Sequence, residues 1–102
     1  GGYDHNYVLD PAQGLRLAAR LVGDKSGIVM ETWTEKPGVQ LYSGNFLETA
    51  DAKGDGVYRP RQGLCLETQF FPDSPNHPAW GDILLRPGRR YDYITEYRFD
   101  VE

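Results

Sequence analysis

The stretch LRLAARLVGDKSGIVMETWT, residues 15–34, decides the fold class. In residues 15–22, leucine and alanine alternate with arginine and other residues, a period of two that predicts a strand with one apolar face. Residues 23–27 supply turn formers, and residues 28–34 are rich in the Ile, Val, Thr and Trp that favour strands. The stretch therefore predicts an antiparallel hairpin.

Further strands are expected on the C-terminal side of this hairpin. Residues 39–42 and 63–69 resume an extended pattern, and the polar, turn-rich segment 48–62 between them predicts a long surface loop. Residues 70–78 contain three prolines and predict an irregular connection. Residues 83–85 and the alternating residues 91–101, on either side of a Pro-Gly turn, predict a last hairpin. The expected fold is all-β.

The composition limits the possible partners. A chain of 102 residues has room for one small domain, and 12 Gly and 7 Pro suit a β domain with many turns. With 11 Lys and Arg against 15 Asp and Glu, the net charge of −4 offers no basic surface for nucleic acid or anionic lipid. No segment approaches the roughly 20 apolar residues that cross a bilayer, so we expect no nucleic acid and no membrane partner.

Cysteine and histidine usage bears on compartment and metal. Cys65 is the single cysteine, which rules out an internal disulfide and a multi-thiolate metal site and fits a reducing compartment. We expect a cytoplasmic location on this ground. His5 and His77 lack the spacing of a zinc motif, so no metal is expected.

Glu67 is a candidate general base. It lies between Leu66 and Thr68 in a predicted strand of small or apolar residues, where desolvation would make a carboxylate a stronger base. The same alternation equally places Glu67 on the solvent face of an amphipathic strand, the more common position for a glutamate.

Two other polar positions could bind a ligand. Asp4 stands next to His5, a pair that suits proton donation or metal binding but is more often found in a loop. Gln40, within an apolar strand, carries two donor hydrogens and an acceptor oxygen suited to hydroxyl groups, or to a neighbouring backbone. Aromatic residues near these positions could pack on the C–H face of a sugar or in the core: Tyr3, Tyr42, Phe70, Phe71 and Trp80. A carbohydrate-binding module and an acid/base enzyme both remain open.

Five segments, in one order and covering almost the whole chain, resemble those of the aldose 1-epimerase (galactose mutarotase) family. They are YDHNYVL at 3–9, AAR ahead of IVME at 18–31, PGVQLYSGNFL at 37–47, GLCLETQ running into PDSPNHP at 63–78, and LLRPG at 84–88. The GNFL and CLETQ segments are the most specific. The resemblance implies the antiparallel β-sandwich of the galactose mutarotase-like superfamily, with residues 1–102 as the C-terminal portion of a single domain.

The resemblance also implies a reaction and a set of site residues. Members interconvert the α and β anomers of aldohexoses such as galactose or glucose by acid/base ring opening, without metal or organic cofactor. Glu67 matches the position of the family's base, while Asp4 and Gln40 match positions that bind sugar hydroxyls. A relative acting on a phosphorylated hexose is a further alternative, for which Arg59 and Arg61 are the cations nearest in sequence to Glu67.

The family's catalytic acid is a histidine from the N-terminal half, and its motif does not occur here. His5 and His77 do not match it. The sequence therefore predicts that this chain alone is inactive. It also predicts that the chain either associates with itself or requires the missing N-terminal part as a partner, because half a sandwich exposes strand edges and core surface.

Overall fold

The computed structural model describes residues 1–50 and 53–102. In this part of the chain, strands alternate with irregular connections, and the longest helical segments are single 3-10 turns. No helix in the described residues is long and apolar enough to cross a membrane. The elements are β1 (Asp4–Val8), β2 (Arg16–Val22), β3 (Ile28–Thr34), β4 (Gly38–Tyr42), η1 (Lys53–Asp55), β5 (Cys65–Gln69), η2 (Ser74–Asn76), η3 (Pro78–Trp80) and β6 (Thr95–Val101).

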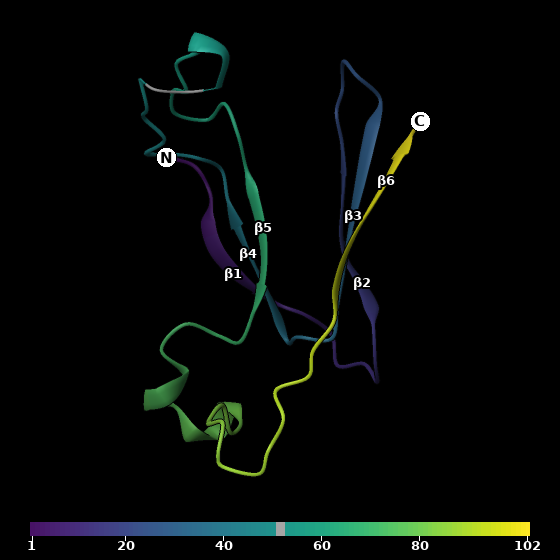
Figure 1. Ribbon diagram of the computed structural model, residues 1–102, viewed down its shortest axis with the longest axis vertical. Helices are drawn as coiled ribbons and strands as arrows, with labels where there is room; N and C mark the ends of the chain where they lie inside the picture. Colours follow the sequence, from purple (N-terminus) through teal and green to yellow (C-terminus); the bar gives the residue numbers. More distant parts are fainter. Residues whose placement is uncertain (51–52) are drawn as a thin grey trace.

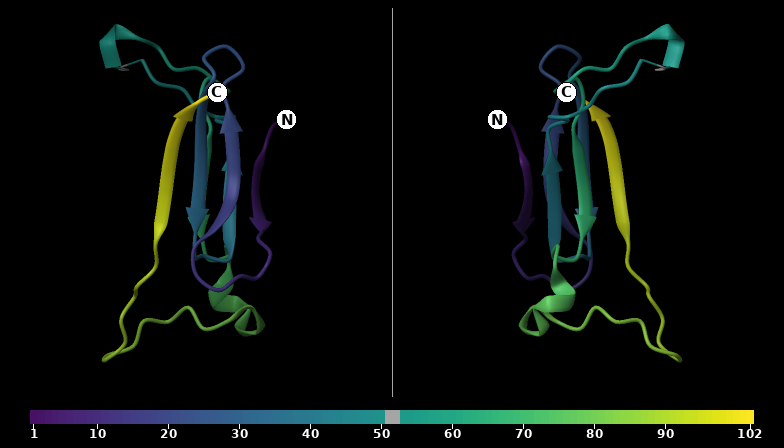
Figure 2. Two further views of the ribbon diagram at one scale, coloured as in Figure 1. Left: turned by 90° about the vertical axis from the view of Figure 1, so that its right-hand side faces the viewer. Right: turned by 90° about the vertical axis from the view of Figure 1, so that its left-hand side faces the viewer.

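The strands form two antiparallel sheets of three. One sheet has the order β1-β4-β5 and the other the order β2-β3-β6. Figure 1 shows the sheets as two layers side by side, and Figure 2 shows that their strands run in nearly the same direction. This aligned arrangement is that of a β-sandwich, so the expected all-β fold is confirmed.

Three threonines connect the inner faces of the sheets. The Thr68 hydroxyl of β5 lies 2.6 Å from the Thr95 hydroxyl of β6, which in turn lies 3.3 Å from the Thr34 hydroxyl of β3. The Tyr97 hydroxyl of β6 donates a hydrogen bond to the Leu66 carbonyl of β5 at 3.0 Å. These contacts fix which face of each sheet points inward.

The inner face is closed at one end and open at the other. Thr32 and Thr34 of β3 are fully buried. Phe99 and Val101 of β6 lie on the same inner face of the sheet, farther from these threonines, and are 69% and 71% exposed. Figure 1 shows the reason, because the two layers spread apart toward the C-terminus. Among the described residues, the structure therefore covers only part of its apolar surface.

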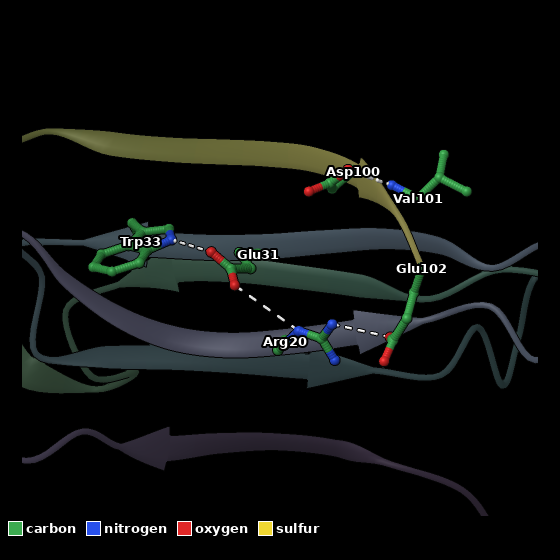
Figure 3. Close-up of polar contacts among 6 residues, drawn as sticks. All are labelled: Arg20, Glu31, Trp33, Asp100, Val101 and Glu102. Carbon is green, nitrogen blue, oxygen red and sulfur yellow. Dashed lines mark hydrogen bonds and ion pairs between the residues drawn. The ribbon is translucent and has the colours of Figure 1, made fainter.

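Charged residues cover the outer face of the β2-β3-β6 sheet (Figure 3). Glu31 accepts a hydrogen bond from the Trp33 indole at 2.9 Å and lies 3.9 Å from Arg20, which also pairs with Glu102 at 3.0 Å. The Arg98 guanidinium lies 4.2 Å from the centre of the Trp33 ring. Exposed pairs of this kind contribute little stability each, and their polar character is that of a solvated outer surface.

Most of the predicted strands are confirmed. The hairpin of residues 15–34 is β2 and β3, and the predicted strands 39–42 and 63–69 are β4 and β5, although β5 begins only at Cys65. The predicted irregular connection at 70–78 is also confirmed, and it contains η2 and the first residue of η3. Within the predicted loop 48–62, Thr49 and Tyr58 form an isolated bridge, while residues 51 and 52 lie outside the described residues.

Two expectations were wrong. The position of Asp4 and His5 in a loop is incorrect, because residues 4–8 form β1 and pair with β4 along their whole length. The last hairpin is incorrect as well: the strand predicted within residues 91–101 is present as β6, but it pairs with β3 over seven residues, and residues 83–85 form no strand. Asp82 accepts a hydrogen bond from the Leu84 N–H at 3.0 Å and pairs with Arg86, local bonds that compete with strand pairing.

The burial of Thr32 leads to a stability prediction. Its hydroxyl is fully buried and has no hydrogen-bond partner among the described residues. We expect Thr32→Val to raise the free energy of unfolding by about 1–2 kcal/mol, because a methyl group replaces an unsatisfied polar group.

Thr34→Val is the matched control. The Thr34 hydroxyl accepts from the Lys36 N–H at 3.0 Å and contacts Thr95, so this variant should lose about 1 kcal/mol. Urea unfolding at one protein concentration measures both variants. A Thr32→Val protein less stable than the parent would contradict the interpretation that the buried Thr32 hydroxyl is unsatisfied.

Candidate functional site

The register of the β1-β4-β5 sheet brings the candidate residues onto one face. Asn6 of β1, Gln40 of β4 and Glu67 of β5 lie directly opposite one another across the three strands. Because side chains alternate along a strand, Asp4 and Gln69, each two positions from a member of this row, share its face. We call these five residues the polar face. It points away from the other sheet, toward which Thr68 is directed.

Hydrogen bonds connect four residues of the polar face. The Gln40 side-chain Nε2 donates to the Asp4 carboxylate at 2.9 Å. The Gln69 Nε2 donates both to Gln40 Oε1 and to Asn6 Oδ1, each at 3.1 Å. A chain of amides thus runs from β4 through β5 to β1, with a carboxylate at one end.

Glu67 lies beside these four hydrogen-bonded residues but makes no bond to them. Its side chain is exposed, and within the described residues it makes no hydrogen bond or ion pair. The expected desolvation is therefore not observed, because Leu66 and Thr68 point to the opposite face of β5 and cannot cover it. The Glu67 side chain starts about 5 Å from that of Gln40, the usual spacing of directly paired strand residues.

An aromatic group adjoins one end of the polar face. Gly38 of β4 lies in the same row as Gln69, and a methyl group placed on it would approach the Phe71 ring at 3.1 Å. Phe71 packs edge-on against Trp80, whose ring stacks on His77 at 3.9 Å. Of the aromatic residues considered from sequence, Phe71 therefore adjoins the site directly.

Tyr42 also lies on the polar-face side of the sheet, two positions from Gln40 in β4, whereas Phe70 and Tyr3 pack against other rings. Tyr42 occupies the same row as Asp4 and bonds to the Phe46 N–H through its hydroxyl. Phe70 packs against Tyr93, and Tyr3 packs edge-on against His5.

Neither histidine joins the polar face. His5 lies between Asp4 and Asn6 in β1, so alternation directs it to the other face of the sheet. His77 bonds to Asp73 at 3.0 Å in the connection after β5. Hydrogen bonds from Asn76 and then His77 lower the pKa of the Asp73 carboxyl below its usual range. No cluster of His, Cys, Asp or Glu in the described part of the chain could hold a metal ion.

Two of the arginines make contacts outside the polar face. Arg61 donates to the Gly1 carbonyl, and Arg86 pairs with Asp82. The Leu84 N–H, followed by Arg86, lowers the pKa of the Asp82 carboxyl. The polar face itself holds two carboxylates and three amides and no cation.

Sequence reasoning missed Asn6 and Gln69. Each lies two positions along its strand from a residue that was identified, Asp4 or Glu67 respectively. Period-2 spacing could have found both, once residues 4–8 had been recognised as a strand.

Known proteins resemble this chain over nearly its whole length. It is 45% identical to the galactose mutarotases of Mus musculus and Homo sapiens over 101 residues, which is 98% of the chain and 30% of each relative. It is 42% identical to the aldose 1-epimerase of Escherichia coli (strain K12) over 104 residues, 99% of the chain and 30% of that protein. The chain thus spans less than a third of the length of these relatives. The sequence model of the family described as Aldose 1-epimerase matches residues 1–98, and the chain belongs to that family.

Proposed function

We propose that this chain is the C-terminal part of an aldose 1-epimerase that interconverts the α and β anomers of an aldohexose such as galactose or glucose. Glu67 would act as the base, while Asp4 and Gln40 bind sugar hydroxyls. The observation that supports this assignment is the row formed by Gln40 and Glu67, in which an exposed carboxylate lies directly opposite an amide bonded to Asp4. Two relatives named above are galactose mutarotases and one is an aldose 1-epimerase.

The proposed reaction moves protons only. The Glu67 carboxylate accepts the proton of the anomeric hydroxyl while an acid protonates the ring oxygen, and the C1–O5 bond breaks to give the open-chain aldehyde. Rotation about C1–C2 presents the other face of the aldehyde, and the reverse transfers close the second anomer. An exposed carboxylate that makes no hydrogen bond or ion pair among the described residues suits this role, because no neighbouring group competes with the anomeric hydroxyl for its oxygens.

We propose that the acid comes from outside this chain. A base and an acid are needed on opposite sides of the hemiacetal, and neither His5 nor His77 lies on the polar face. We propose that an N-terminal part supplies a catalytic histidine and completes the sandwich. The exposed inner face near Phe99 and Val101 supports this, since apolar sheet faces are normally covered.

The two alternatives are weaker. A phosphorylated hexose would require cations, and the polar face offers none. A non-catalytic carbohydrate-binding module would use the same hydroxyl-binding amides, so only activity separates it from the enzyme.

We expect Glu67→Gln to lower kcat by about 10²–10⁴-fold with little change in sugar binding, because the amide keeps the shape but cannot accept the proton. The measurement uses a chimera in which this chain replaces the matching segment of the Escherichia coli relative, with polarimetry of freshly dissolved α-galactose. Glu48→Gln, an exposed glutamate outside the polar face, is the control and should retain full activity. Sugar binding without turnover in the parent chimera would favour the binding module, whereas unchanged turnover in the Glu67 variant would overturn the base assignment.

The 102-residue chain alone should not accelerate mutarotation. Its described residues place Glu67 on a face without a histidine, so ring opening lacks its acid. Polarimetry of the isolated chain against buffer tests this. A rate above the buffer rate, abolished by Glu67→Gln, would show that the acid lies within these residues.

The isolated chain should also self-associate. Phe99 and Val101 on the inner face are each about 70% exposed, and burying such side chains is favourable by roughly 25 cal/mol per Å². Sedimentation equilibrium should give a mass above the 11.6 kDa of the monomer. A monomer that unfolds cooperatively would contradict the incomplete-sandwich interpretation.

A further inference from the structure

The hydrogen-bond chain of the polar face has a direction that a single group determines. Asp4 is a carboxylate and can only accept, so Gln40 must turn its Nε2 toward it. The Gln40 Oε1 consequently points toward β5, where only a donor can satisfy it. Gln69 provides that donor, with its Nε2 at 3.1 Å.

Gln69 extends these hydrogen bonds to β1 and again acts as the donor. An amide nitrogen has two hydrogens, and Gln69 uses one on Gln40 and the other on Asn6 Oδ1. The Asn6 oxygen is thereby engaged, which leaves its Nδ2 as the free end. Asn6, Gln40 and Gln69 are all partly buried, so their amides lose more than exposed groups would by leaving a bond unmade.

We propose that Gln69 is a positioning residue that fixes the orientation of both Gln40 and Asn6 and makes Asn6 a third hydroxyl-binding group. This role rests on the proposed sugar site. With the direction fixed, the face presents amide donors from Gln40 and Asn6 and acceptors from Asp4 and Gln69. A neutral polyol suits this set, because each hydroxyl both donates and accepts.

Side-chain amide resonances of the ¹⁵N-labelled chimera test the coupling directly. Asp4→Asn removes the group that sets the direction, so the amide signals of Gln40, Gln69 and Asn6 should all shift. In a Gln69→Leu background, the Asn6 signal should no longer respond to Asp4→Asn, whereas that of Gln40 still should. Asn76, whose amide donates to Asp73, should respond in neither background.

Two further variants make the outcome decisive. Gln69→Glu keeps the size of the side chain but has no N–H at neutral pH, so it should uncouple Asn6 in the same way even if the leucine variant folds poorly. Gln62→Leu, at an exposed glutamine remote from the polar face, should leave the coupling intact. An Asn6 signal that ignores Asp4→Asn in the parent, or still follows it without Gln69, would overturn the proposal.

Kinetics of the chimera separate positioning from chemistry. Gln69→Leu should raise KM about tenfold and leave kcat within about threefold, because it disturbs hydroxyl binding and not the base. A loss confined to kcat would overturn the positioning role. Failure of the base assignment would appear instead as full turnover in Glu67→Gln. The amide coupling is measured without any turnover, so it tests the positioning role independently of the base assignment.

Discussion

The register of β4 between β1 and β5 is the constraint on which the site depends. It places Gln40 opposite both Asn6 and Glu67, three residues far apart in the sequence. Because successive strand residues point to opposite faces, a slip of one position in β5 would turn Glu67 toward the core and bring Thr68 to the surface. That slip would also break the contact between Thr68 and Thr95 that links the sheets. One pairing therefore fixes the position of the proposed base and the packing of the two layers.

The incomplete sandwich and the incomplete site have a common explanation in our account. The sheets meet at Thr34 and Thr95 but separate toward Phe99 and Val101, which stay exposed. The polar face carries Glu67 without a histidine beside it. The chain matches about 30% of the length of its relatives, so a single N-terminal part could cover the apolar face and supply the acid. Completion of the apolar core and catalysis would then require the same missing residues.

Much of the fold could be predicted from local pattern, but its pairing could not. The alternation in residues 15–34 was enough for the β2–β3 hairpin, because both strands and their turn lie in one stretch. Residues 4–8 carry no comparable alternation, and β1 depends on its partner β4. For residues 83–85, apolar character predicted a strand, whereas the carboxylate of Asp82 holds the segment by local bonds. Glu67 and Gln40 were identified from sequence, but their position opposite each other needed the register, as did the roles of Asn6 and Gln69.

Glu67 is, in our proposal, the base of an active site completed by other residues. Complementation tests it most directly: the 102-residue chain is titrated into the separately produced N-terminal remainder of the Escherichia coli relative, and mutarotation of α-galactose is followed by polarimetry. We expect a rate that rises above buffer, saturates when the two parts are equimolar, and disappears when the added chain carries Glu67→Gln. A complex that forms without activity, or that is equally active with Glu67→Gln, would contradict this proposal.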